Sequence, residues 1–202
     1  VNWCPHCNTS ISDAEVEYEE KDGSFWHLLY PVKETGEMLE LATTRPETML
    51  GDTAVAINGD DPRYAHLHGC HVILPLLNKE IPIVCDEHAD MTKGTGVVKI
   101  TPAHDPNDFE VGLRHDLPIV RVFTYDGRMT GAADKAAADA LFAAGKNTVN
   151  EPQVLDCGKY AGMTTMEARK AILADLKEGG FLKAIEPLKH EVGTCYRCHS
   201  TI

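Results

Sequence analysis

Short runs of apolar residues separated by polar and turn-forming residues dominate the chain, a pattern typical of strands. Before the first run, Asp22-Gly23 is a turn signal. A tight Asn78-Lys79 connection separates two of the runs. We expect strands over residues 25–32, 37–44, 53–57, 72–77, 81–84, 97–101 and 118–123, and a strand-like return over 181–190.

Three stretches carry helix signals instead. Asp105 can cap a helix that begins at Pro106 and runs to about residue 115. Residues 132–144 are rich in alanine and end at a glycine, and residues 164–167 form a capping box that opens a helix ended by Gly179. Many short strands with a few helices predict an α+β fold, in which a curled, barrel-like sheet carries the helices on its outside.

Two segments share one arrangement, in which an apolar strand leads into polar residues around a proline. The first is ATTRPETMLGD over residues 42–52, and the second is GTGVVKITPAHDPNDF over residues 94–109. A helix can start at each proline, so hydroxyls, charges and open backbone N–H groups gather where a strand ends. Such a place suits a polar or anionic ligand.

The charged residues of these segments indicate what a ligand would offer. Arg45 and Lys99 can meet phosphate, ribose or a developing oxyanion, and Asp105 and Asp108 can hold an ammonium or a hydroxyl donor. Each has a structural alternative, since both aspartates are good residues for a helix start and a lysine usually faces solvent. His104 is a candidate base, although a turn residue that orients the loop is the stronger reading.

Threonine hydroxyls can line a small pocket as adaptable donors and acceptors. Those of the two segments are Thr43, Thr44, Thr48 and Thr101. Because side chains alternate along a strand, at most one of Thr43 and Thr44 should face the pocket.

The cysteines are placed as two Cys-x-x-Cys pairs at the two ends of the chain, Cys4 with Cys7 and Cys195 with Cys198. Such pairs can hold a structural zinc ion between four thiolates. Two unrelated pairs or a redox dithiol are the alternatives. We expect a zinc-ribbon base over residues 1–12 and 191–202, a separate domain over 13–190, and three further cysteines that are small buried residues.

Composition limits the partners. The chain has 202 residues and a formal charge of −12, which argues against a broad nucleic-acid-binding surface. No apolar run approaches the roughly 18 residues of a membrane helix, and no signal peptide is recognisable at the start. The start also lacks methionine. We expect a cytoplasmic piece of a larger protein, with no membrane partner and only local contact with RNA.

The two segments resemble those of the editing domain of valyl-tRNA synthetases, and the resemblance runs over nearly the whole chain. Leucyl enzymes have a similar Thr-Thr-Arg-Pro-Asp-Thr segment, but the Lys99 to Asp108 run fits the valyl type best. The resemblance implies an α+β barrel fold flanked by zinc ribbons. It also implies that Asp108 holds the α-ammonium of an aminoacyl group and that Asp105 recognises a threonine hydroxyl.

The function that follows from the resemblance is hydrolysis of threonyl-tRNA that carries the valine anticodon, by attack of water on the ester. Lys99 and Thr101 would stabilise charge on oxygen, while the terminal adenosine of the tRNA would be received near Arg45. The substrate-binding residues would be Arg45, Thr44, Thr48, Asp105, Asp108 and His104. The expected partners are the 3′ end of the tRNA and the rest of the parent synthetase. A zinc-tethered, non-catalytic tRNA-binding or docking module is the alternative, and a zinc hydrolase is less favoured because four thiolates leave no open position.

Overall fold

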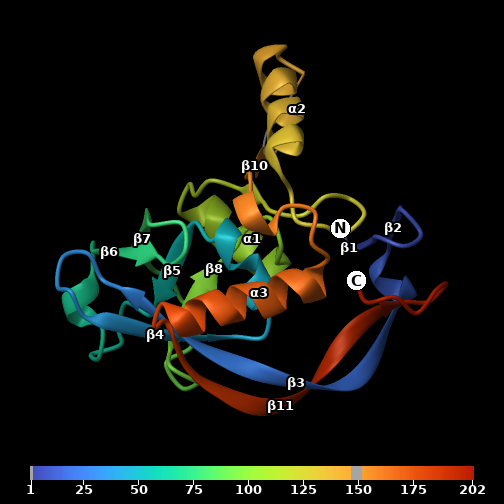
Figure 1. The fold of residues 1–202 in the computed structure, drawn as a ribbon. Coiled ribbons are helices and arrows are strands. Elements are labelled where there is room, and N and C mark those ends of the chain that lie inside the picture. Colours follow the sequence, from blue (N-terminus) through green and yellow to red (C-terminus); the bar gives the residue numbers. More distant parts are fainter. Residues whose placement is uncertain (1, 147–151) are drawn as a thin grey trace.

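The computed structural model describes residues 2–146 and 152–202. Val1, the first residue of the predicted zinc-ribbon base, lies outside the described residues. Figure 1 shows a main body of sheets and helices, a long two-stranded ribbon below it, and a small lobe at which the two ends of the chain meet.

A four-stranded sheet in the order β6-β7-β5-β8 forms one part of the main body. Its strand β5 pairs in parallel with β7 and antiparallel with β8. Because β5 is central and fully buried, its sequence AVAI is apolar at every position. The bounds are β5 (Ala54–Ile57), β6 (His71–Leu74), β7 (Lys79–Cys85) and β8 (Val97–Ile100).

The second sheet has the order β11-β3-β4 and contains the two longest strands. They are β3 (Val16–Pro31) and β11 (Leu182–Cys195), and β4 (Met38–Thr43) pairs with the end of β3. The predicted strand 25–32 therefore begins nine residues earlier, at Val16. The outer half of β3 pairs only with β11 and buries neither face, so it has no apolar alternation to reveal it.

Asp22-Gly23 is correspondingly no turn but part of β3, opposite residues 188 and 189. A side-chain carbon on Gly23 would lie 2.2 Å from the ring of His190, which crosses the strand there. The absence of a side chain at Gly23 leaves room for the ring of His190. The residues next to Gly23 in the sequence give no sign of this contact.

The prediction of a barrel-like sheet is wrong. Among the described residues the strands form separate sheets and no closed barrel, and the architecture is mixed α+β. The remaining sheets have two strands each: β1 (Asn2–Cys4) with β2 (Thr9–Ile11), and β9 (Val120–Arg121) with β10 (Gln153–Val154).

The three predicted helices are confirmed. They are α1 (Pro106–Arg114), α2 (Ala132–Ala143) and α3 (Thr165–Glu178). Asp105 caps α1, and Thr164 with Glu167 forms the capping box of α3. After Pro46 the chain forms a 3-10 helix, η2 (Pro46–Gly51), and further single 3-10 turns are η1 (Asp13–Glu15), η3 (Ala65–Leu67) and η4 (Gly158–Tyr160).

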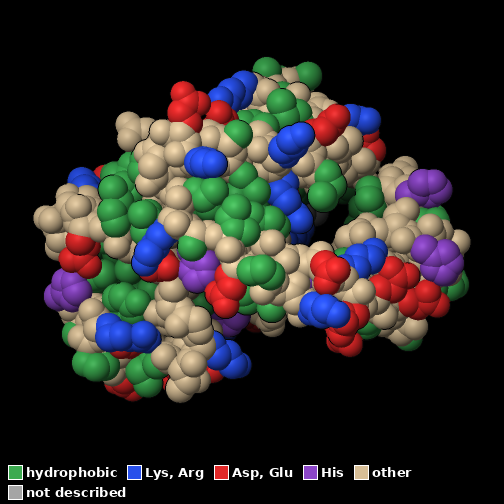
Figure 2. Space-filling model, turned by 60° about the horizontal axis from the view of Figure 1, so that its bottom comes forward, with side chains coloured by type: hydrophobic (Ala, Val, Ile, Leu, Met, Phe, Trp, Pro, Cys, Tyr) green, Lys and Arg blue, Asp and Glu red, His purple; other side chains and the backbone are tan. Residues whose placement is uncertain are grey.

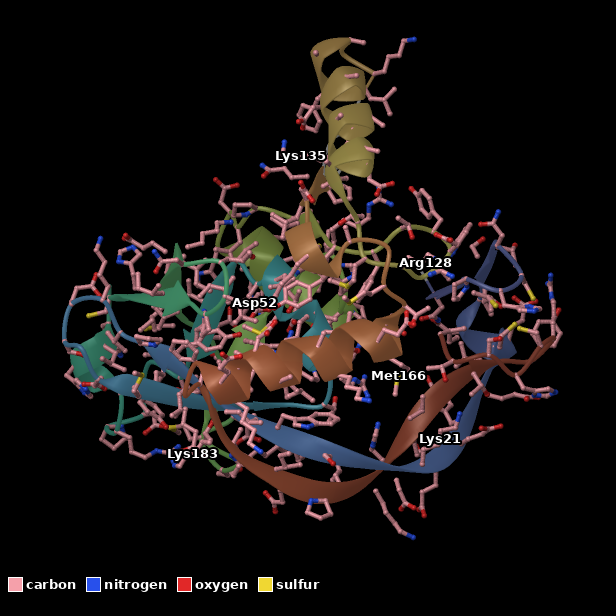
Figure 3. All side chains as sticks on the ribbon, viewed as in Figure 1. Lys21, Asp52, Arg128, Lys135, Met166 and Lys183 are labelled. Carbon is pink, nitrogen blue, oxygen red and sulfur yellow. The ribbon has the colours of Figure 1, made fainter. Side chains whose placement is uncertain are left out.

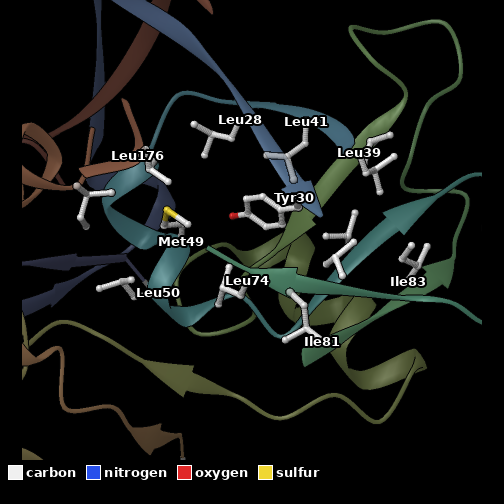
Figure 4. Packing of buried hydrophobic residues seen from close by; sticks show 14 of the residues in the cluster. Leu28, Tyr30, Leu39, Leu41, Met49, Leu50, Leu74, Ile81, Ile83 and Leu176 are labelled. Carbon is white, nitrogen blue, oxygen red and sulfur yellow. The ribbon is translucent and has the colours of Figure 1, made fainter. Parts of the chain in front are cut away.

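The main core lies between the two larger sheets, with α3 against η2. Figure 4 shows Tyr30 in the middle of this cluster, close to Leu41, Met49 and Leu74. Its ring is fully buried, yet its hydroxyl donates a hydrogen bond of 2.8 Å to Asp52. A polar group therefore enters the centre of the core, and its partner belongs to the first of the two polar segments.

Figure 2 shows Lys, Arg, Asp and Glu side chains gathered on the side of the molecule with the chain ends, where the β3–β11 ribbon joins the terminal lobe. None of the helices in the described part of the chain has the length and apolar character needed to cross a membrane.

Candidate active site

The two polar segments meet at one pocket of about 220 Å³ between β4, β8 and the start of α1. They come together because β4 and β8 contact each other and both end at this place. The pocket includes every predicted catalytic and substrate-binding residue. Its lining is Phe25, Ala42, Thr43, Thr44, Arg45, Thr48, His88, Val98, Lys99, Thr101, His104, Asp105, Asn107 and Asp108.

Lys99 points to the interior rather than to solvent, with only 10% of its side chain exposed. Its ammonium donates to the Thr48 hydroxyl at 2.8 Å, to the Asp52 carboxylate at 3.3 Å, and to the Thr101 hydroxyl at short range. An ammonium has three protons, so these three acceptors use all of them. In this arrangement Lys99 contributes positive charge to the pocket wall but has no free proton to donate.

Asp108 lies in the first turn of α1 and is 6% exposed. Its Oδ2 accepts the backbone N–H of Thr101 at 2.9 Å, while Oδ1 lies 3.5 Å from His88 Nε2. Burial raises the pKa of this carboxyl to about 6, although the Thr101 N–H and Lys99 oppose the rise. One oxygen thus anchors the loop, and the other remains available on the pocket side.

Asp105 combines its structural role with a place in the pocket. Its Oδ1 accepts the backbone N–H groups of Asn107 at 2.8 Å and Asp108 at 3.3 Å, as an N-cap residue does. Among the described residues, Oδ2 accepts no hydrogen bond. The capping alternative and the ligand-binding alternative are therefore compatible in one side chain.

The first segment contributes backbone and hydroxyl groups on the opposite wall. The Thr48 hydroxyl donates to the carbonyl of Arg45 at 2.9 Å, and the Arg45 N–H donates to Thr43 at 3.0 Å. Thr43 and Thr44 both line the pocket, contrary to the expected alternation, because β4 ends at Thr43 and the chain turns there. The Arg45 side chain is 48% exposed and donates to the carbonyl of His104 at 2.8 Å, so it lies at the edge of the pocket.

His104 has the environment of a loop anchor. Its Nε2 accepts the backbone N–H of Val122 at 3.0 Å, and its ring packs edge-on against Phe123. Burial lowers the pKa of His104 to about 3, with further lowering by Arg45 and Lys99. The neutral ring therefore carries its proton on Nδ1, and its basic nitrogen is already occupied.

The sequence analysis assigned no role to two residues of this region. His88 belongs to the loop after β7 and has no apparent motif, so only the fold brings it to Asp108. Asp52 was part of the first segment without an assigned role. An aspartate two residues after apolar Leu50 and two residues before the buried strand β5 is an available signal, since an unpaired carboxylate would be costly there.

The four terminal cysteines come together in the small lobe. Their sulfur atoms all lie within 4.8 Å of one another, and those of Cys4 and Cys198 are 3.5 Å apart. Sulfurs bound to one tetrahedral zinc ion lie about 3.8 Å apart, because each is about 2.3 Å from the metal. These residues therefore fit a metal ion. Of the other three cysteines, Cys157 is buried as predicted, but Cys70 is only partly buried and Cys85 is exposed.

The known family and proteins that are similar to this chain all belong to aminoacyl-tRNA synthetases. The family "Leucyl-tRNA synthetase, editing domain" matches residues 62–177. The valine–tRNA ligases of Clostridium tetani and Lactococcus lactis are both 52% identical to the chain, over 100% and 96% of it. The valine–tRNA ligase of Aquifex aeolicus is 48% identical over the whole chain.

The chain belongs to the aminoacyl-tRNA synthetase editing domains. It spans about a fifth of the length of the curated relatives, 20% for the Clostridium tetani ligase and 17% for that of Aquifex aeolicus. The fold of this editing domain also resembles part of the LeuRS chain in the crystal structure of a ternary complex of Agrobacterium radiobacter K84 LeuRS with tRNA and LeuAMS. The TM-score is 0.51 and the sequence identity is 17%. The likeness covers 91% of this chain and 24% of the LeuRS chain.

Proposed function

We propose that this editing domain hydrolyses threonyl-tRNA that carries the valine anticodon, so that a valine–tRNA ligase releases a wrongly attached threonine. Valine and threonine have nearly the same shape, and a hydrophobic site for valine rejects threonine only about a hundredfold. A second site can exploit the difference between the two, which is the threonine hydroxyl.

The observation that supports this proposal is the set of acceptors in a small pocket. Asp105 and Asp108 each have an oxygen free of described hydrogen bonds there, beside the threonine hydroxyls of both segments. The volume of about 220 Å³ is below the roughly 300–1,000 Å³ of typical small-molecule sites. It suits an aminoacyl group, with the terminal adenosine outside, near the exposed Arg45.

In the proposed reaction Asp108 holds the α-ammonium and Asp105 accepts the side-chain hydroxyl. A valyl group would leave that acceptor unpaired, which costs about 1–3 kcal/mol. Water attacks the ester carbonyl, the bond from the carbonyl carbon to the ribose oxygen breaks, and that oxygen leaves as the hydroxyl of the tRNA with a proton from the water. Positive charge from Lys99, with Thr101 beside it, favours the negative charge that develops on the carbonyl oxygen. Thr44, Thr48 and Nδ1 of His104 would contribute polar contacts to the substrate.

We further propose that a zinc ion bound by the four terminal cysteines is structural. Four thiolates complete a tetrahedral shell, so no position remains for substrate. Such an ion would join the two chain ends at the place where the domain connects to its parent synthetase, which together with the tRNA would be its partner. A docking module without activity would need a zinc ion that joins the chain ends, but it would not need buried hydrogen-bond acceptors in a pocket.

Asp108→Ala tests the proposal. We expect deacylation of threonyl-tRNA to fall about ten- to a hundredfold, because a charge-assisted contact to the substrate is lost. Glu110→Ala, on the exposed side of the same helix, is the matched control and should retain activity. Full activity of a folded Asp108→Ala variant would exclude the ammonium-binding role.

A further inference from the structure

Glu47 is a carboxylate inside the first polar segment, next to the pocket residue Thr48, and only 3% of its side chain is exposed. A buried carboxylate is costly unless a cation pairs with it. Among the described residues, two arginines lie within 4 Å of it, Arg169 and Arg45. Their distances from the carboxylate differ, and of the two only Arg45 lines the pocket.

Arg169 binds both oxygens of Glu47. Its Nε donates to Oε2 at 2.8 Å and its Nη2 donates to Oε1 at 2.7 Å, the paired geometry that suits a guanidinium and a carboxylate. The guanidinium also lies over the ring of Trp26, 5.2 Å from its centre. Arg169 belongs to α3, which packs against η2, and in the view of Figure 3 Asp52, the residue after η2, lies just above this helix. Contacts with Glu47 and Trp26 thus fix the Arg169 side chain.

Arg45 lies close to the same carboxylate without being bound to it. Its Nε is 3.9 Å from Glu47 Oε1, beyond hydrogen-bond distance, while its Nη1 donates to the carbonyl of His104 at 2.8 Å. A guanidinium has five N–H donors, and among the described residues the bond to His104 uses only one of them. Arg45 therefore keeps most of its donors for a ligand at the pocket edge.

We propose that Arg169 is a positioning residue: by holding both oxygens of Glu47, it prevents this carboxylate from binding Arg45. Arg45 then keeps its charge and its donors for the end of the tRNA. The inference rests on the proposed function, in which the terminal adenosine lies near Arg45. Without Arg169, the buried carboxylate would have Arg45 as its nearest cation, and Arg45 would close on it and leave the pocket edge.

Arg169→Ala should therefore weaken substrate binding and leave the chemical step intact. We expect KM for threonyl-tRNA to rise about tenfold and kcat to change less than about twofold, because a charged contact to the bound substrate is lost while the ester is not touched. Arg169→Lys keeps a cation beside Glu47 but not the paired geometry, so it should recover part of the binding. Lys170→Ala is the matched control, since Lys170 is the next residue of α3, is exposed and forms no salt bridge with Glu47.

A double-mutant cycle separates this role from a general loosening of η2. In Glu47→Gln no carboxylate is left to bind Arg45, so the additional loss of Arg169 should have no further effect on KM. If Arg169 only held α3 against η2, Arg169→Ala would raise KM by the same factor in both backgrounds.

Chemical labelling of Arg45 tests the same claim without the reaction. Phenylglyoxal reacts with accessible guanidinium groups, and mass spectrometry gives the labelling rate at Arg45 in the chain without tRNA. We expect this rate to fall several-fold in Arg169→Ala, because Arg45 is then bound to Glu47. In the double variant with Glu47→Gln the rate should equal that of the unsubstituted chain.

The kinetic constants are measured by release of labelled threonine, with melting temperatures for every variant. Both the purified chain and the chain placed in the Clostridium tetani valine–tRNA ligase instead of the segment it matches are used. Should Arg169→Ala not fold, Arg169→Gln takes its place, since its amide can donate to Glu47 but has no charge.

An unchanged KM or an unchanged labelling rate of Arg45 in the folded variant, or equal losses in both backgrounds of the cycle, would overturn the inference while the proposed function stands. No threonine release in either context would instead contradict the proposed function. The labelling rate would then still decide whether Arg169 keeps Glu47 from binding Arg45.

Discussion

At the scale of single residues, the pocket combines groups that are costly to bury with groups that a ligand can use. Asp108 is the clearest case, because binding of an ammonium requires the ionised carboxylate while burial favours the neutral acid. The ordinary pKa of 3.8 becomes about 6 in the folded chain. A cationic ligand would supply the missing counter-charge, so this residue is better suited to the bound state than to the empty one.

The pH dependence of stability follows from this shift. The folded chain binds the Asp108 proton more tightly than the unfolded chain, so stability falls as the pH rises from about 4 to about 6 and stays lower above that. Asp108→Asn should therefore stabilise the protein at about pH 8, by up to about 3 kcal/mol, and have little effect at about pH 4.

Urea unfolding at both pH values measures this difference. In the unsubstituted chain, threonine release should decline below about pH 6, as Asp108 becomes neutral. Equal destabilisation of Asp108→Asn at the two pH values would show that the carboxylate is structural and not strained by burial.

At the scale of elements, the helices and the short buried strands could be predicted because each carries its own local signal. The Asp105-Pro106 start of α1 and the Thr164 capping box of α3 are such signals, and the structure confirms both. The outer half of β3 has no such signal, since its pairing with β11 depends on residues far along the chain. For the same reason the sequence brought out Asp105 and Asp108 but not His88, which reaches the pocket only through the fold.

The close approach of η2 to the first residue of β9 leads to a further prediction. A side-chain carbon on Gly51 would be 2.8 Å from the carbonyl oxygen of Val120, which is backbone and cannot easily move. Gly51→Ala should therefore lower the free energy of unfolding by about 1–3 kcal/mol and shift the adjacent Asp52.

Thermal unfolding measures this loss of stability. Gly59→Ala is the matched control, since the nearest atom to its added carbon would be 3.6 Å away. If both variants melted at the same temperature as the unsubstituted chain, the close approach of η2 to β9 would be contradicted.

At the scale of the whole molecule, the terminal lobe and the pocket lie at different parts of the chain's surface and have different chemistry. The cysteines gather where the two ends meet, whereas the acceptors gather where β4 and β8 end (Figure 1). We expect Cys198→Ser to lose bound zinc and to melt at a lower temperature. Cys85→Ser, which changes an exposed cysteine outside the cluster, should retain both properties.

Metal analysis by mass spectrometry, together with thermal unfolding, checks this expectation. About one zinc ion per chain is expected in the unsubstituted protein and in Cys85→Ser. Equal metal content in all three proteins, or none in any, would contradict a structural zinc site at the chain ends.

The most direct test of the account is the release of amino acid from threonyl-tRNA and from valyl-tRNA. We would measure it for the purified chain and for the chain placed in the Clostridium tetani valine–tRNA ligase instead of the segment it matches, each with and without a zinc chelator. The account predicts that threonine is released faster than valine in at least one of the two contexts, and that Asp108→Ala slows this release. No release of threonine in either context, while the unmodified ligase releases it, would contradict the proposed function.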